Sequence, residues 1–224
     1  MTSVQQEFQD RVQEIEAYLG LIAGLDEGRT ALVQKESGAA AYSSQAQDDL
    51  VRTSKASALL LLYNLMESTA SNAVEAIYDE MANRDVAFDA CRREVRLVVL
   101  ANLKRHAPAK ILPDLTQLTT DIISKAFQKD KLVSGNVDAE EIRGIADTYG
   151  FRHPAADGRD LLTVKSHRND LAHGVKSFAE VGRTFSMQDV VRLKDQVITY
   201  LTALLESVAH YIAQQHYLSA PGRP

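Results

Sequence analysis

The sequence of 224 residues contains one cysteine, Cys91, no tryptophan and only five prolines. A single cysteine excludes a disulfide framework and a cysteine-based zinc site. No apolar run approaches the roughly 20 residues that a membrane-spanning helix needs. The start of the chain, MTSVQQEFQD, is polar and acidic, which is unlike a secretory signal peptide. We therefore expect a cytoplasmic protein with no membrane association.

The chain also lacks an excess of basic residues, because 25 Lys and Arg stand against 30 Asp and Glu, a formal net charge of −5 at pH 7. Proteins that hold nucleic acid mainly by electrostatics carry a basic surface, so any RNA site here must be small and local. No P-loop and no G-x-G-x-x-G occurs, so we expect no cofactor. No zinc finger or other DNA-reading element is evident, so we expect no sequence-specific DNA binding.

Helical periodicity fills most of the sequence, and its apolar fraction of 45% is typical of a globular protein. The strongest apolar stripe lies within residues 47–83 and predicts a helix central to a bundle. Its members are Leu59, Leu62, Tyr63, Met66, Ala70, Ala73, Val74, Ile77 and Met81. Residues 187–217 carry two apolar rows, which predicts neighbours on two sides of that helix and a contribution to a dimer.

Further helices are predicted near residues 8–22, 86–106, 115–127 and 139–149. Asp138 is a good N-cap for the last of these and Gly150 a good stop. Gly20, Gly24 and Gly28 weaken the end of the first helix, where we expect fraying. We predict an all-α, up-and-down helical bundle over residues 45–218, an extra N-terminal helical arm over residues 1–35, and a disordered tail over residues 219–224.

Chemically versatile side chains concentrate in residues 165–174, whose sequence is KSHRNDLAHG. Here four residues separate Arg168 from His173. Arginine is a permanently charged, forked donor that suits a phosphate, and histidine can give and take a proton near neutral pH. A cation for the phosphate together with an acid/base is the minimum set of groups for cleaving RNA without a metal.

We expect this stretch to form a helix that Asp160 caps and that ends at His173, with Gly174 in the left-handed position beyond it. On an ideal helix His173 lies about 140° around the axis from Arg168, whereas Asn169 and His173 share a face. Because the last turn of a helix is loose, the long Arg168 side chain can reach toward the imidazole.

Two other interpretations of these residues stay open. Charged side chains at this spacing are typical of the solvated face of a short helix. His167, Asp170 and His173 recur every third residue and could together bind a metal. No second histidine cluster supports that site, so we expect no metal.

The hexapeptide Arg168-Asn-Asp-Leu-Ala-His173 resembles the R-x4-6-H motif of the HEPN superfamily (higher eukaryotes and prokaryotes nucleotide-binding). Its flanks, LLLLYNLMES at residues 59–68 and SFAEVGR at residues 177–183, resemble the larger prokaryotic HEPN-like nucleases of toxin–antitoxin and defence systems. The resemblance covers most of residues 45–215.

This resemblance implies a metal-independent endoribonuclease that acts on RNA as a toxin or defence effector, with a site shared across a homodimer and an antitoxin protein as a partner. The implied roles are proton transfer by His173, charge stabilisation by Arg168, a hold on the imidazole or the phosphate by Asn169, and orientation of the arginine by Glu67. The remaining candidates, for substrate binding, are Lys165, Asp170, Lys176, Arg183, Asn64 and Tyr63.

Two alternatives belong to other classes of function. One is a non-catalytic HEPN-like module that binds a nucleotide, RNA or a protein. The other is a purely structural dimerising bundle in which Arg168 is only an ion-pair partner. Cleavage of RNA in the presence of EDTA would separate the enzyme from both.

Overall fold

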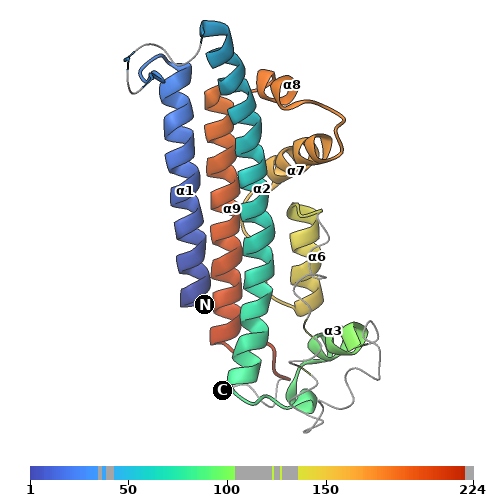
Figure 1. Cartoon of the computed structure of the whole chain (residues 1–224). Helices are drawn as coiled ribbons and strands as arrows, with labels where there is room; N and C mark the ends of the chain where they lie inside the picture. The colour runs from blue at the N-terminus through green and yellow to red at the C-terminus, as the bar shows by residue number, and fades with distance from the viewer. Residues whose placement is uncertain (35–36, 39–42, 104–122, 124–126, 128–135, 220–224) are drawn as a thin grey trace. The chain divides into compact units, whose positions relative to one another are not determined.

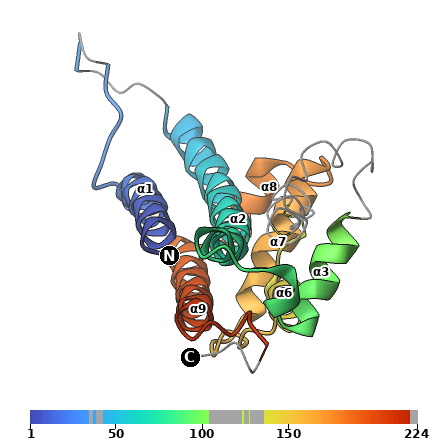
Figure 2. The ribbon, with the colours of Figure 1, turned by 90° about the horizontal axis from the view of Figure 1, so that it is seen from below.

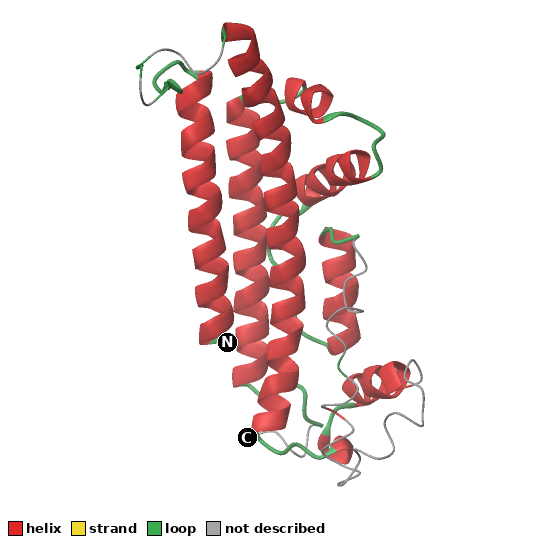
Figure 3. Ribbon diagram, in the orientation of Figure 1, coloured by secondary structure: helices red, strands yellow, loops and turns green. Residues whose placement is uncertain are grey.

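The structure, a computed structural model, describes residues 1–34, 37–38, 43–103, 123, 127 and 136–219. The predicted all-α class is confirmed, because no strand occurs in these residues (Figure 3). The elements are α1 (Thr2–Asp26), α2 (Ser44–Asn83), η1 (Phe88–Ala90), α3 (Arg93–Leu103), α6 (Ala139–Tyr149), α7 (Arg159–Ala172), α8 (Phe178–Arg183) and α9 (Met187–Ala213) (Figure 1). Most of the helix predicted over residues 115–127, and the predicted tail from residue 220, lie outside the described residues.

The chain divides into two compact units. We call Gln6–Met66 with Asp157–Thr199 the motif unit, and Met1–Gln5, Glu67–Ala156 and Tyr200–Pro224 the tyrosine unit. The apolar stripe predicted for α2 is confirmed, since each of its nine residues is at most 2% exposed. None of the described helices combines the length and the apolar composition required to cross a bilayer.

In the motif unit, α1 and the first parts of α2 and α9 run beside one another, as the view along them shows (Figure 2). Tyr18 of α1 donates its hydroxyl hydrogen to the carbonyl of Ser54 on α2 at 3.2 Å. Lys194 of α9 lies 3.6 Å from the carboxylate of Glu16 on α1. The core between them is aliphatic and includes Val12, Ile15, Leu19, Leu59, Leu62, Leu193 and Val197.

Helix α1 does not fray where we expected it to. It continues through Gly20 and Gly24 to Asp26, and the backbone N–H of Thr30 then donates to the carbonyl of Gly24 at 2.8 Å. A Cβ on Gly24 would lie 2.4 Å from the Thr30 hydroxyl oxygen. The prediction was wrong because Gly24 is used for close packing of the returning chain, which offsets its low helix propensity.

Helix α8 contacts α2 through Gly182. A Cβ at this position would lie 1.8 Å from the carbonyl oxygen of Arg52. Ser177 caps α8 reciprocally, because its side chain accepts from the Glu180 backbone while Glu180 accepts from the Ser177 backbone. The downstream segment SFAEVGR is thus a capped helix that touches α2 backbone to backbone.

We predict that Gly182→Ala lowers the free energy of unfolding by about 2 kcal/mol, because backbone atoms of α2 must move to admit the new methyl group. The matched variant is Gly20→Ala at an exposed position of α1, where a Cβ meets nothing within 4 Å. It should raise stability by about 0.5–1 kcal/mol through helix propensity. Urea denaturation followed by circular dichroism measures both, and equal midpoints for the two variants would contradict the close approach.

The tyrosine unit is organised by buried phenol groups. The Tyr211 hydroxyl donates to the Tyr149 carbonyl at 2.8 Å, and the Tyr78 and Tyr149 hydroxyls are 3.3 Å apart. Burial raises the pKa of the Tyr149 phenol. Both predicted ends of α6 are confirmed, since the Asp138 side chain accepts from the Glu141 N–H and Gly150 is left-handed with φ 82°.

Cys91 belongs to the core of the same unit, as its place in an apolar row predicted. It is fully buried, and burial raises the pKa of its thiol to about 11. A thiol protonated at neutral pH is a weak nucleophile. Cys91 is therefore a packing residue.

Candidate functional site

The site is built on the C-terminal half of α7, in the motif unit. The helix ends at Ala172, His173 is its C-cap, and Gly174 follows with φ 66°, as predicted. The N–H of Val175 then donates to the carbonyl of Asp170 at 2.8 Å, which turns the chain back along the helix. The backbone thus fixes His173 at the helix terminus.

The predicted start of α7 was wrong. Gly158 is the N-cap residue, and Asp160 lies within the first turn. The Asp160 carboxylate is 2.7 Å from the guanidinium of Arg192 on α9 and so joins α7 to α9. The Asp160 carboxylate thus pairs with Arg192 of α9 and does not cap the start of α7.

Arg168 is held in place from α2. Its guanidinium carbon lies 4.5 Å from the centroid of the Tyr63 ring, which is fully buried. A cation over an aromatic face is attracted by the electron density of the ring. We had predicted that Tyr63 contacts substrate, but a ring with no exposed surface supports Arg168 instead.

Asn169 connects the two motif residues. Its side-chain oxygen accepts a hydrogen bond of 3.1 Å from the Arg168 guanidinium, and its backbone carbonyl accepts one of 3.0 Å from the His173 N–H. We had expected the Asn169 amide to hold the imidazole or a phosphate. Its observed side-chain partner is the guanidinium of Arg168.

The His173 side chain is exposed. Its imidazole makes no hydrogen bond or ion pair with the rest of the described chain. Ser166 and Asn169 share its side of α7, since helix positions three or four residues apart lie above one another. The imidazole of the motif is therefore open to a ligand.

Asp170 and Lys176 form an ion pair beside the motif, with the ammonium nitrogen 2.6 Å from the carboxylate. This hydrogen bond lowers the pKa of the Asp170 carboxyl. The imidazole of His167 lies 3.9 Å from the same carboxylate oxygen and meets the ring of Phe185 edge-on at 5.0 Å. The pairing of Asp170 with Lys176 depends on the turn at Gly174 and was not visible in the residue spacing.

The other predicted site residues are spread around this centre. Lys165 is half-buried on α7, Asn64 is exposed on α2, and Arg183 is exposed at the end of α8. Glu67 is half-buried and begins the part of α2 that belongs to the tyrosine unit. Its role in orienting Arg168 stays a prediction.

The metal interpretation gains no support from the geometry. Within the residues that the structure describes, no three His, Cys, Asp or Glu side chains come together as a group that could hold an ion. His167 lies 3.9 Å from Asp170, but His173 is not grouped with them.

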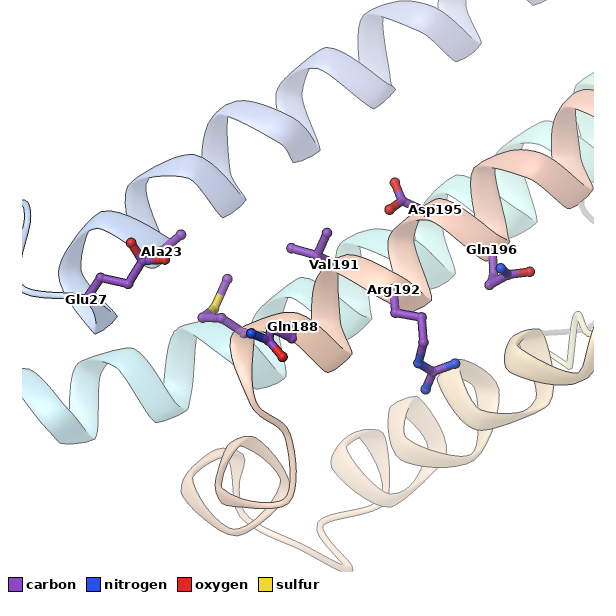
Figure 4. Close-up of a pocket in the computed structure, with 8 residues that line it drawn as sticks. Ala23, Glu27, Gln188, Val191, Arg192, Asp195 and Gln196 are labelled. Carbon is purple, nitrogen blue, oxygen red and sulfur yellow. The ribbon is translucent and has the colours of Figure 1, made fainter.

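A separate groove of about 390 Å³ lies between α1 and α9 (Figure 4). Its lining residues are Ala23, Glu27, Met187, Gln188, Val191, Arg192, Asp195 and Gln196. No residue of the motif lines it, and its arginine is already paired with Asp160. We therefore assign the site to α7 and not to this groove.

Sequence reasoning did not find two supporting residues, His167 and Gly182. His167 directly precedes the motif arginine; its spacing of three from Asp170 was noticed, but only as part of a possible metal site. Gly182 sits in the SFAEVGR flank, where a glycine inside a short helix indicates a close approach.

The comparisons with known proteins agree with the motif. A family model described as HEPN_MAE_28990-like HEPN matches residues 1–217. No curated protein and no solved structure matches the chain.

Proposed function

Because the chain belongs to the HEPN_MAE_28990-like HEPN family over residues 1–217, we propose that it is a metal-independent endoribonuclease that acts as a toxin or defence effector. The observation that carries this proposal is the contrast at the end of α7. Arg168 is held over the buried Tyr63 ring and by Asn169, whereas the His173 side chain is exposed. A fixed cation and an exposed acid/base, five residues apart at the end of one helix, are the groups that cleavage of a phosphodiester needs.

In the proposed reaction a ribose 2′-OH attacks the adjacent phosphorus and the 5′-oxygen leaves, which gives a 2′,3′-cyclic phosphate and a 5′-hydroxyl. His173 removes the 2′-OH proton or protonates the departing 5′-oxygen. Arg168 stabilises the negative charge that develops on the phosphate oxygens. Lys165, Lys176, Arg183 and Asn64 supply contacts to neighbouring phosphates and sugars, and Glu67 helps to orient the arginine.

One imidazole cannot serve at once as base and acid in the same step, which favours a second copy of the chain. The exposed side of the motif helix supports this, because Leu162 is 55% exposed and Val175, just past His173, is 68% exposed. Exposed apolar residues beside a polar centre are typical of an interface. We propose that a homodimer places two His173 side chains in one site.

The second apolar row of α9, to which Val191, Leu205 and Ile212 belong, offers less exposed surface to such a dimer than the sequence predicted. Leu205 and Ile212 are buried within the chain, at 3% and 8% exposure, whereas Val191 is exposed at 38%. Leu162, near the start of α7, and Val175, just past its end, are therefore the better candidates for the interface.

We predict that Tyr63→Leu lowers the rate of RNA cleavage by about 10-fold, because the guanidinium loses an attraction worth about 1 kcal/mol and its fixed position. Tyr63→Phe keeps an aromatic face and should retain most activity. The measurement is kcat/KM for a fluorescent RNA, with thermal unfolding of both variants. Equal loss in the two would mean that the hydroxyl, not the ring face, is what Arg168 needs.

The test of the function uses the purified full chain, RNA and EDTA. We expect fragments that end in a 2′,3′-cyclic phosphate, and no cleavage of RNA whose 2′-hydroxyls are methylated. Expression without a protective partner should slow growth. Binding of RNA without any cleavage would instead identify a non-catalytic HEPN-like binding module.

A further inference from the structure

His167 is a second histidine next to the motif, and its surroundings are unusual. Its side chain is 21% exposed, and its Nδ1 atom is buried without a hydrogen-bond partner. A buried polar atom that lacks a partner is costly and is rare in folded proteins. The ring itself is fixed, since it packs edge-on against Phe185.

A carboxylate close to that nitrogen is already paired with another group. The Asp170 Oδ2 atom is 2.6 Å from the Lys176 ammonium and 3.9 Å from His167 Nδ1. The second distance is too long for a hydrogen bond. The Asp170 Oδ2 atom thus has two candidate partners, Lys176 and His167, and it pairs with Lys176 alone.

The exchange of partners requires only a side-chain movement. The N–H groups of Val175 and Lys176 donate to the backbone carbonyl of Asp170, at 2.8 and 3.4 Å. These bonds hold the turn whether or not the carboxylate stays on Lys176. The Lys176 side chain is 45% exposed and can move into solvent.

We propose that Asp170 is a two-position carboxylate that holds Lys176 in the free protein and turns to His167 Nδ1 when an anion takes Lys176. In the second position the Asp170 carboxylate accepts a hydrogen bond from the protonated Nδ1 of His167 and stabilises the imidazolium. Binding of a phosphate at Lys176 and uptake of a proton by His167 are therefore coupled. Asp170 and Lys176 position the site and are not themselves part of the chemistry.

The charges around His167 agree with this arrangement. Burial lowers the pKa of His167 and the Lys176 ammonium lowers it further, while Asp170 opposes both. The connection between α8 and α9 contributes Phe185 as the neighbour of the His167 ring, and this residue is uncharged. When Lys176 moves away from Asp170, it no longer lowers the pKa of His167, and the Asp170 carboxylate comes closer to the imidazole. The pKa of His167 must therefore rise. By reciprocity, protonation of His167 must favour anion binding at Lys176.

The identity of the anion as an RNA phosphate rests on the proposed ribonuclease function, whereas the exchange itself does not. In that setting the imidazolium of His167, beside Arg168 in the chain, adds a second positive charge only after a phosphate has arrived. The site would thus become more basic on substrate binding, within a chain whose net charge is −5.

The exchange is tested on the full chain without any RNA, by following the His167 Cε1 proton in an NMR pH titration. His167→Gln assigns the resonance. In Lys176→Gln the pKa of His167 should rise by about one unit, because Asp170 is released to it. Lys176→Arg preserves the charge and should leave the pKa as it is in the unmodified chain.

The double variant separates exchange from simple charge removal. If Asp170 carries the effect, Lys176→Gln should change the pKa of His167 little in an Asp170→Asn background. A full rise in that background would overturn the proposal, since Lys176 would then act through space alone. Circular dichroism of each variant checks that the helices are kept.

A second experiment addresses the anion. A 2′-O-methylated RNA oligonucleotide, which cannot be cleaved, should raise the pKa of His167 in the unmodified chain but not in Asp170→Asn. Binding of this RNA with no change at His167 would overturn the coupling while leaving the ribonuclease proposal intact. Absence of RNA binding would count against the ribonuclease proposal, and the titration without RNA would still decide the exchange.

Discussion

His173→Ala should reduce RNA cleavage by at least about 100-fold, which is the contribution expected of a positioned general acid or base. The fold should be unaffected, because His173 contributes only its backbone N–H to the end of α7 and its side chain is exposed. Single-turnover cleavage in EDTA measures the first effect, and circular dichroism with thermal unfolding measures the second. Growth toxicity should disappear in parallel.

The matched control is His153→Ala. Like His173, His153 is exposed, but it belongs to the tyrosine unit and lies outside the motif. Its imidazole lies 2.7 Å from the carboxylate of Asp147. Its loss should leave cleavage unchanged. Undiminished cleavage by the His173 variant would refute the acid/base assignment, whatever the family of the chain.

Arg168→Ala should reduce cleavage by about 100- to 1000-fold, the cost of removing one preorganised donor from developing negative charge. Arg168→Met should lose as much activity while keeping apolar contact with the Tyr63 ring, and so should be the more stable of the two. Arg168→Lys keeps the charge but not the planar fork, and we expect it to remain well below the unmodified protein. The measurement is kcat/KM together with the thermal midpoint of each variant.

The control for general loss of positive charge is Arg11→Ala. Arg11 is an exposed arginine of α1 that pairs with Glu7 one turn away and has no role in the site. A loss of activity in Arg168→Met no larger than that in Arg11→Ala would mean that Arg168 is only a structural partner of Tyr63. The assignment of Arg168 to charge stabilisation in the reaction would then be wrong.

The flanks that carry the resemblance have physical roles that the structure supplies. Tyr63, inside LLLLYNLMES, lies under Arg168, and Gly182, inside SFAEVGR, touches the backbone of α2 at Arg52. Tyr63 positions Arg168 of the motif helix, and Gly182 positions the neighbouring helix α8. Neither residue offers a group to a ligand. A similarity in these segments therefore reflects how the motif is held.

The sequence by itself determined the helical class, the buried stripe of α2, the caps at Asp138 and Gly150, and the end of the motif helix at Gly174. These features follow from the chain's own periodicity and from backbone preferences within a few residues, so spacing is enough to predict them. Asp160 is the exception, because Arg192 of another helix competes for its carboxylate.

Only the tertiary structure decided which groups from outside the motif helix touch it. It put the Tyr63 ring under Arg168, the Phe185 ring against His167 and the Lys176 ammonium against Asp170. Hydrogen bonds, ion pairs and burial depend on which distant segment arrives beside a residue, and the spacing within one helix does not contain that information. The motif was therefore visible in the sequence, and its supports were not.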